Sequence, residues 1–124
     1  MRARTQLARP PRIYHVNWFR RDANGKFLWP GFGENLRVLA WMLERCAGRV
    51  DAAESAIGRL PHPADLELRG LDLGSEALTA LLTVDPALWR KEIADMREYL
   101  GRYGQRLPGA LLAELRTTEE RLSG

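Results

Sequence analysis

The most unusual part of this 124-residue sequence is the stretch Phe27–Asn35, which places three large aromatic side chains and two glycines around one turn. An ordinary loop seldom carries so much apolar surface. Glycine lets the backbone approach a ligand closely, and a helix that begins after the turn presents free N–H groups. Asn35 adds a donor and an acceptor in one side chain. Aromatic rings stack on flat bases, which contributes about 1–3 kcal/mol per base, so the stretch predicts a pocket for a flat base.

Phe19 and Phe27 lie on the two arms of a predicted hairpin and can add walls to this pocket. The same side chains also suit a hydrophobic plug, because aromatics on a tight turn usually pack beneath the neighbouring helix. Spacing alone favours the plug, and composition does not decide between the two interpretations. Glu34 is open to two roles as well: a general base, or, more commonly, a carboxylate that stabilises the N-terminal end of a helix dipole.

No catalytic or metal-binding motif is predicted. Gly25-Lys26 is followed by Phe27 where a phosphate-binding loop needs Ser or Thr. His15 has no acid or nucleophile in a recognisable arrangement, and we expect it to be a hydrogen-bonded structural residue. Cys46 is the only cysteine, so it cannot form an internal disulfide, and with only two histidines beside it there is no zinc-ligand set. Its place on an apolar face favours a core role.

Length and composition predict one soluble globular domain. The sequence is 45% hydrophobic and 28% charged with four Trp, which is too apolar for intrinsic disorder. Charged residues interrupt every apolar run well short of the roughly 18 residues of a membrane span. The N-terminus has no apolar run after its arginines, as a secretory signal would have. We therefore expect a cytoplasmic protein with no membrane as partner.

The net charge of +3 arises near the N-terminus, where six arginines precede the first acidic residue, Asp22. Residues 1–11 form a predicted basic arm, and residues 12–124 the predicted folded part. A basic arm can follow nucleic-acid phosphates, but this arm has no aromatic residue to stack on a base. A solvated arm, or a surface for another protein, is the favoured interpretation, and we do not expect nucleic acid as a partner.

The candidate pocket lies between a predicted hairpin and a predicted helix. Residues 13–19 are rich in β-branched and aromatic types with partial alternation, which predicts a strand. Asp22–Gly25 supplies turn residues, and Lys26–Trp29 can form the return arm. From Asn35 to Ala47 an apolar face recurs at helical spacing, and Gly48 closes the helix. The predicted core face of this helix consists of Leu36, Leu39, Leu43 and Cys46, widened by Trp41 and Met42.

The rest of the chain is predicted to be mainly helical. Residues 50–73 read as an irregular connection with at most short strands near Ile57 and Leu66–Leu68. Ser75 can cap a short helix that ends at Leu82. Asp85-Pro86 starts a longer helix that Gly104 stops, Pro108 opens the last one, and the two helices should pack as an antiparallel pair. Their apolar stripes are Trp89, Ile93, Met96, Leu100 and Tyr103, and then Leu111, Leu112, Leu115 and Leu122.

Three blocks near the N-terminus resemble one known family. They are His15-Val16-Asn17-Trp18-Phe19-Arg20-Arg21-Asp22, then Asn24-Gly25-Lys26-Phe27-Leu28-Trp29-Pro30-Gly31-Phe32-Gly33-Glu34-Asn35, then Arg37-Val38-Leu39. With Ile57-Gly58 and Trp89 further along, the sequence resembles the GTP-dependent phosphoenolpyruvate carboxykinase family over about residues 10–122. The family enzyme is several times longer, and the chain resembles only its final portion.

The resemblance implies an α/β parent fold. This chain would be a mainly α-helical piece of the C-terminal nucleotide-binding domain, spanning residues 12–124, with an N-terminal strand and hairpin. The family converts oxaloacetate and GTP to phosphoenolpyruvate, carbon dioxide and GDP, with manganese. The resemblance further implies that the phenylalanines enclose the guanine, that Asn35 reads its polar edge and that the backbone of the Phe32–Asn35 turn adds contacts. The implied site residues are Phe19, Phe27, Phe32, Gly33, Glu34 and Asn35.

The family's phosphate-binding loop, manganese ligands, reactive cysteine and oxaloacetate-binding arginines precede the portion that this chain resembles. We therefore expect no catalytic residue and no metal ligand here, and no activity of the chain alone. The implied partners are a guanine nucleotide, GTP or GDP, and the missing N-terminal part of the enzyme or a complementary chain. The sequence departs from the family at Leu36, usually Ser, and at Ser55-Ala56, usually Thr-Pro. A small basic binding module for nucleic acid or a protein partner is the alternative function.

Overall fold

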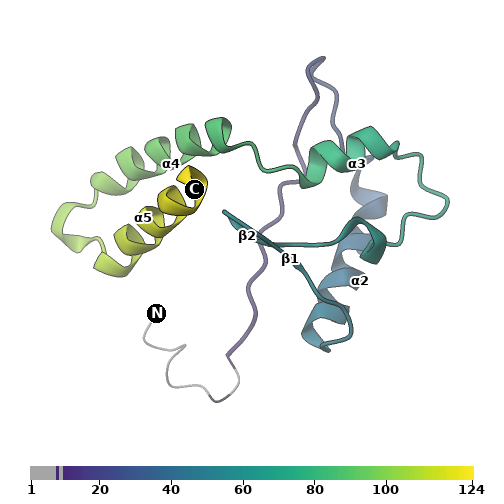
Figure 1. Cartoon of the computed structure of the whole chain (residues 1–124), viewed down its shortest axis with the longest axis horizontal. Helices are drawn as coiled ribbons and strands as arrows, with labels where there is room; N and C mark the ends of the chain where they lie inside the picture. Colours follow the sequence, from purple (N-terminus) through teal and green to yellow (C-terminus); the bar gives the residue numbers. More distant parts are fainter. Residues whose placement is uncertain (1–7, 9) are drawn as a thin grey trace. The chain divides into compact units, whose positions relative to one another are not determined.

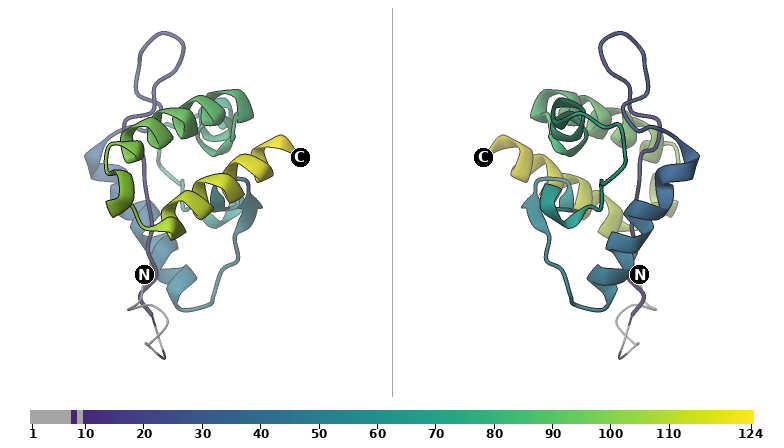
Figure 2. Two further views of the ribbon diagram at one scale, coloured as in Figure 1. Left: turned by 90° about the vertical axis from the view of Figure 1, so that its left-hand side faces the viewer. Right: turned by 90° about the vertical axis from the view of Figure 1, so that its right-hand side faces the viewer.

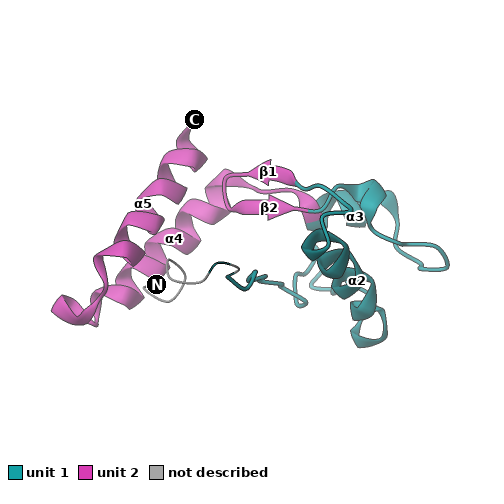
Figure 3. Ribbon diagram, turned by 90° about the horizontal axis from the view of Figure 1, so that it is seen from below, with its two compact units in different colours: residues 1–52, 61–81 teal, residues 53–60, 82–124 magenta. Residues whose placement is uncertain are grey.

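The computed structural model describes residue 8 and residues 10–124, so the predicted basic arm lies almost wholly outside the described residues. The chain divides into two compact units, coloured separately in Figure 3. The first runs through Ala52 and resumes at Pro61–Leu81. The second consists of Ala53–Leu60 and Leu82–Gly124. The candidate site residues all belong to the first unit.

The first unit is built around helix α2 (Asn35–Cys46), which follows the short 3-10 helix η1 (Phe32–Glu34) (Figure 1). Both ends are set by glycines in the left-handed region, Gly31 with φ 130° before η1 and Gly48 with φ 73° after α2. The helix from Asn35 is therefore confirmed. A second 3-10 helix, η2 (Pro63–Asp65), and helix α3 (Ser75–Leu82) follow later in the chain.

The predicted core face of α2 is wrong. Trp41 is the buried residue of the helix, at 5% exposure, whereas Leu36, Leu39, Leu43 and Cys46, for which a core role was also predicted, are exposed. Trp41 packs edge-on against Tyr14, with ring centroids 6.1 Å apart. A helix with large apolar residues on more than one side can bury only the side for which neighbours exist, and the Tyr14 ring lies on the Trp41 side.

The predicted strand over residues 13–19 does not form. Strands are held by ladder hydrogen bonds to a neighbour, and among the described residues the only pairing near this segment is an isolated antiparallel bridge between Arg21 and Phe27. Burial nevertheless alternates along the segment, because Tyr14, Val16 and Trp18 are half-buried while the residues between them are exposed. The period-two pattern therefore reflects an extended segment packed on one side, without a sheet.

The turn between the two predicted arms is confirmed. Gly25 has φ 79° and donates its N–H to the Asp22 carbonyl at 3.0 Å. The Asp22 carboxylate also accepts from the N–H groups of Asn24 and Lys26, at 2.8 and 2.9 Å. The return arm makes only the bridge at Phe27, so the N-terminal hairpin is reduced to a tight loop.

The β-hairpin of this chain lies in the second unit instead. Strands β1 (Ala53–Ser55) and β2 (Gly58–Leu60) pair antiparallel, with Ala53 opposite Leu60 and Ser55 opposite Gly58. The short strands expected near Ile57 are thus present on either side of it. The one expected at Leu66–Leu68 is not, because these residues follow η2 and Leu66 is buried at 9% exposure without a strand partner among the described residues.

Helices α4 (Pro86–Gly101) and α5 (Gly109–Ser123) lie side by side and antiparallel, with the 3-10 helix η3 (Gly104–Arg106) between them (Figure 1; Figure 2). Asp85 caps α4 by accepting from the N–H groups of Ala87 and Leu88. The core of the pair is Ile93, Leu115 and Leu122, against which Trp89 and Leu100 pack. This antiparallel pair and the mainly helical content are confirmed.

Three residues of the predicted stripes lie outside that core. Met96, Tyr103 and Leu111 are between 38% and 46% exposed. Tyr103 instead hydrogen-bonds Tyr99 through the two hydroxyls, at 3.0 Å. Helix α4 ends at Gly101, one turn before the predicted stop at Gly104, so Tyr103 falls outside the helix. No helix in the described part of the chain is long and apolar enough to cross a membrane.

Candidate functional site

The Phe27–Asn35 stretch forms a tight turn that leads directly into α2. Gly31 adopts φ 130°, a conformation that strains any side chain, and its carbonyl accepts the Glu34 N–H at 3.1 Å. The Asn35 N–H donates to the Phe32 carbonyl. This geometry places Phe32 at the outer edge of the turn, with 91% of its surface exposed.

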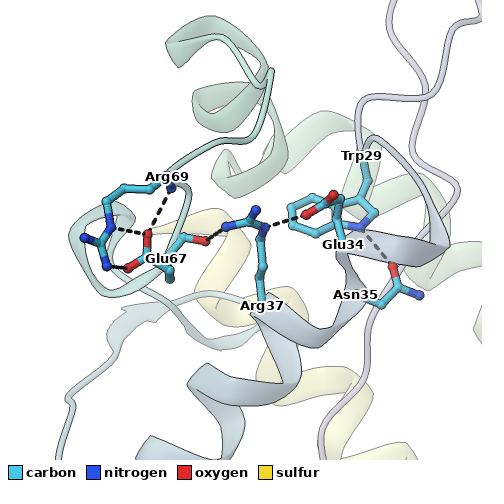
Figure 4. A network of polar contacts seen from close by, with 6 residues as sticks. All are labelled: Trp29, Glu34, Asn35, Arg37, Glu67 and Arg69. Carbon is cyan, nitrogen blue, oxygen red and sulfur yellow. Dashed lines mark hydrogen bonds and ion pairs between the residues drawn. The ribbon is translucent and has the colours of Figure 1, made fainter.

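Trp29 lies beneath this turn. Its side chain is 6% exposed, and its ring packs against Trp18 with centroids 6.1 Å apart. The indole Nε1–H donates to Asn35 Oδ1 at 2.9 Å (Figure 4). Within the stretch, the plug interpretation therefore holds for Trp29 and does not hold for Phe32.

The Trp29 bond decides which end of the Asn35 amide is free. An indole N–H can only donate, so the amide oxygen must face it. The Asn35 amide nitrogen, with its two donors, is then the group left for a ligand. Sequence reasoning credited Asn35 with offering both a donor and an acceptor and missed the Trp29 bond. The only signal was a tryptophan six residues before the asparagine across a Pro-Gly turn.

Arg37 connects the start of α2 to the loop that contains Glu67. Its Nε donates to Glu34 Oε2 at 2.5 Å, and its Nη1 donates to the Glu67 carbonyl at 2.7 Å (Figure 4). The Glu34 carboxylate is therefore engaged in an ion pair with Arg37, which supports a structural role for Glu34 over that of a general base. No sequence motif indicated Arg37 or Glu67, which are 30 residues apart.

The Glu67 side chain extends the same network. Arg69 donates to both carboxylate oxygens, from Nε at 2.9 Å and from Nη2 at 2.8 Å. The Arg69 backbone N–H donates as well, at 3.0 Å. These hydrogen bonds stabilise the charged form and lower the pKa of Glu67 to about 2.

Phe19 and Phe27 form an aromatic pair at the loop that the Arg21–Phe27 bridge closes. Their ring centroids are 6.1 Å apart and the planes are inclined by 63°. Both rings are open to solvent, at 72% and 44% exposure. The Arg21 guanidinium lies 4.0 Å from the centre of the Phe27 ring. The pairing expected from opposite arms is thus present, although the arms form no sheet.

The predicted site residues fall into two groups in space. Phe19 and Phe27 form one, and the turn residues Phe32, Gly33, Glu34 and Asn35 form the other. Among the described residues, no ring contact joins Phe32 to either of the other two phenylalanines. Phe19 and Phe32 offer exposed rings, the Arg21 guanidinium lies over the Phe27 ring, and Asn35 offers amide donors.

Comparison with known proteins decides the family. Residues 1–121 match the model of the phosphoenolpyruvate carboxykinase C-terminal P-loop domain. The chain belongs to this family. It is 49% identical over 115 residues to phosphoenolpyruvate carboxykinase [GTP] of Treponema pallidum subsp. pallidum, covering 92% of this chain and 19% of that protein. The same enzyme of Paenarthrobacter aurescens is 44% identical over 120 residues, covering 97% of this chain and 20% of the relative.

A third relative has a similar level of identity. Phosphoenolpyruvate carboxykinase [GTP] of Neocallimastix frontalis is 48% identical over 116 residues, covering 93% of this chain and 19% of that protein. The chain therefore spans about a fifth of the length of the carboxykinases it matches. Within residue 8 and residues 10–124, no three His, Cys, Asp or Glu residues gather so that they could hold a metal ion. The described residues therefore do not fit a manganese site.

Proposed function

We propose that this chain supplies the guanine-binding part of a GTP-dependent phosphoenolpyruvate carboxykinase, the enzyme that converts oxaloacetate and GTP to phosphoenolpyruvate, carbon dioxide and GDP. Its relatives carry GTP in their names. The observation that carries the proposal is the hydrogen bond from Trp29 to Asn35, which leaves amide donors free at the start of α2. Exposed phenylalanines in the same unit add the flat surfaces that a base needs.

The orientation of Asn35 favours guanine over adenine. Guanine presents an oxygen acceptor at its position 6, whereas adenine presents an amino donor there. An amide nitrogen can donate to the guanine oxygen. Facing the adenine amino group it would leave two donors opposed, and an unpaired buried polar group costs about 1–3 kcal/mol. Asn35 therefore acts as the residue that selects the base.

The phenylalanines supply affinity without selecting the base. Phe19 and Phe27 already form one aromatic corner, and Phe32 stands exposed on the turn that carries Asn35. Stacking on a ring face is available to any purine. The backbone of Phe32, Gly33 and Glu34 adds contacts to the base, and Gly33 has nothing within 4 Å of the position where a Cβ would stand. A ligand can therefore approach the chain closely at Gly33.

Catalysis requires more than this chain provides. Phosphoryl transfer depends on metal ions and phosphate clamps that neutralise the transferred group, and the relatives are about five times longer than the matched segment. We assign the manganese ligands, the phosphate-binding loop and the oxaloacetate site to the remainder of the enzyme, or to a complementary chain. On this view the chain is inactive by itself.

The proposal is tested by nucleotide selectivity in a chimera in which this chain replaces the matched segment of the Treponema pallidum enzyme. Wild type should prefer GTP over ATP in kcat/KM, and Asn35→Ala should reduce that preference about tenfold, in line with the cost of one mismatched polar group. Asn24→Ala, in the turn between the two arms, is the matched control and should leave the preference unchanged. An unaltered preference in Asn35→Ala would assign base selection to the backbone of the turn instead.

A further inference from the structure

Helix α2 buries Trp41 and also carries apolar residues that are exposed to solvent. Ordinary surface helices bury an apolar stripe and present charged residues to water. In α2 the exposed residues are Leu36, Leu39, Ala40, Leu43 and Cys46, and none of them is charged. Leu36, Leu39 and Leu43 are 70%, 45% and 66% exposed. We call this set the leucine face.

The polar residues of α2 lie away from the leucine face and already have partners within the first unit. These pairs are Asn35 with Trp29, Arg37 with Glu34, Glu44 with Arg49, and Arg45 with the Val50 carbonyl. All four polar residues of the helix are half-buried. Whatever covers the leucine face must therefore contribute apolar side chains, and it finds no charge there to pair with.

We propose that the leucine face packs against the remainder of the carboxykinase nucleotide-binding domain, the part of the relatives that lies outside the matched segment. This inference rests on the proposed function, because it takes the chain to work as part of the longer enzyme. About four-fifths of each relative's length lies outside the match, which is ample chain to cover one helix. Large contiguous apolar patches on a protein surface, especially those rimmed by polar residues, mark interaction surfaces.

A second copy of this chain is a poorer occupant. Helix α2 has 12 residues, and at about 1.5 Å per residue it is about 18 Å long. A stable dimer buries about 800 Å² per partner, which is more than one face of so short a helix offers. In the relatives, the rest of the enzyme is joined to the matched segment through the same polypeptide. A body joined in this way needs no such minimum area, because its association is intramolecular.

Cys46 provides a native probe of this packing. It is an exposed residue of the leucine face, with the Tyr14 hydroxyl 3.7 Å from its Sγ, and it is the only cysteine of the chain. Glu120→Cys places a second thiol on an exposed position of α5 as an internal control. Alkylation by N-ethylmaleimide is followed at each thiol by peptide mass spectrometry, in the isolated 124-residue chain and in the Treponema pallidum chimera, without nucleotide.

We expect Cys46 to react at least tenfold more slowly in the chimera than in the isolated chain, while the thiol introduced by Glu120→Cys reacts at similar rates in both. Leu43→Lys should leave the melting temperature of the isolated chain within about 2 °C and lower that of the chimera by more than 5 °C. Equal Cys46 reactivity in both proteins would overturn the proposal. A chimera that does not fold would also overturn the proposal, because the leucine face would then not pack against the rest of the Treponema pallidum enzyme.

Two further outcomes separate this inference from its alternatives. Protection of Cys46 that rises with the concentration of the isolated chain would assign the leucine face to a second copy and overturn the proposal. Affinity of the chimera for GTP is measured separately by calorimetry. Protection of Cys46 without GTP binding would contradict only the proposed guanine site, and GTP binding without protection would contradict only the packing of the leucine face.

Discussion

The indole nitrogen of Trp29 and the amide oxygen of Asn35 lie 2.9 Å apart, in a hydrogen bond that spans the turn between them. Trp29 is buried, and Asn35 begins helix α2. A buried donor-only group thus holds the orientation of a side chain at the edge of the candidate pocket. The base specificity that we propose for Asn35 depends on this hydrogen bond from Trp29.

Trp29→Phe should weaken base selection without removing the pocket. Phenylalanine keeps much of the apolar volume but cannot donate, so the Asn35 amide becomes free to turn its oxygen outward. We expect the GTP-over-ATP preference of the chimera to fall, and the fold to lose about 1 kcal/mol from the missing hydrogen bond. Competition binding with both nucleotides measures the first effect and urea unfolding the second. A full GTP preference in this variant would show that Asn35 holds its orientation without Trp29.

Phe32→Ala should separate affinity from selectivity. The ring is 91% exposed and makes no selective polar contact, so its loss removes stacking that any purine can use. We expect the affinity for GTP and for ATP to fall by similar factors, about tenfold each. Isothermal titration of the chimera with both nucleotides checks this. A loss confined to GTP would give Phe32 a part in reading the base.

The Glu67 carboxylate should make the stability of the first unit sensitive to acid. The pKa of Glu67 is lowered to about 2 from an ordinary value of 4.5, chiefly by the side-chain hydrogen bonds from Arg69. A carboxylate with a lowered folded pKa contributes stability that is present above pH 4.5 and is lost as the pH falls toward 2. Melting temperatures across this range should therefore fall less steeply in Glu67→Gln than in wild type. Parallel profiles for the two proteins would show that the Glu67 carboxylate does not contribute to folding stability.

The folding stability of the second unit should depend on Ile93. This side chain is 1% exposed and belongs to the α4–α5 core together with Leu115 and Leu122. Ile93→Ala should cost about 2–5 kcal/mol, whereas Leu88→Ala on the same helix, at 60% exposure, should cost about 0.5 kcal/mol or less. Denaturant unfolding followed by circular dichroism measures both. Equal losses would contradict the core described here.

The isolated chain should not form phosphoenolpyruvate from GTP and oxaloacetate with manganese. The described residues offer no metal cluster, and phosphoryl transfer needs charge neutralisation by metal ions. A coupled assay, with the chimera as the positive control, checks this expectation. Turnover above the rate without protein would contradict the assignment of catalysis to the remainder of the enzyme.

Local chemistry was enough to predict much of the secondary structure. The caps and breakers at Gly48, Asp85-Pro86 and Pro108 act within one turn of the chain, so their effect can be read without knowing what lies nearby. The same is true of the Asp22–Gly25 turn, whose hydrogen bonds join residues at most four apart. The aromatic side chains of the candidate site were singled out for a similar reason, since so many aromatics around two glycines are unusual in any fold. Spacing favoured a buried plug, and the sequence did not predict that Phe32 would be exposed while Trp29 is buried.

Tertiary structure alone decided which apolar residues are buried and which distant residues come into contact. Leu36, Leu39 and Leu43 repeat at helical spacing just as core residues do, but the Tyr14 ring packs against Trp41, and the three leucines remain exposed. The segment 13–19 has strand-forming residues, and no ladder partner is available to it among the described residues. Arg37 and Glu67 meet across 30 positions of sequence. Periodicity shows which residues of an element share a side, and only packing decides which side is covered and which distant groups meet.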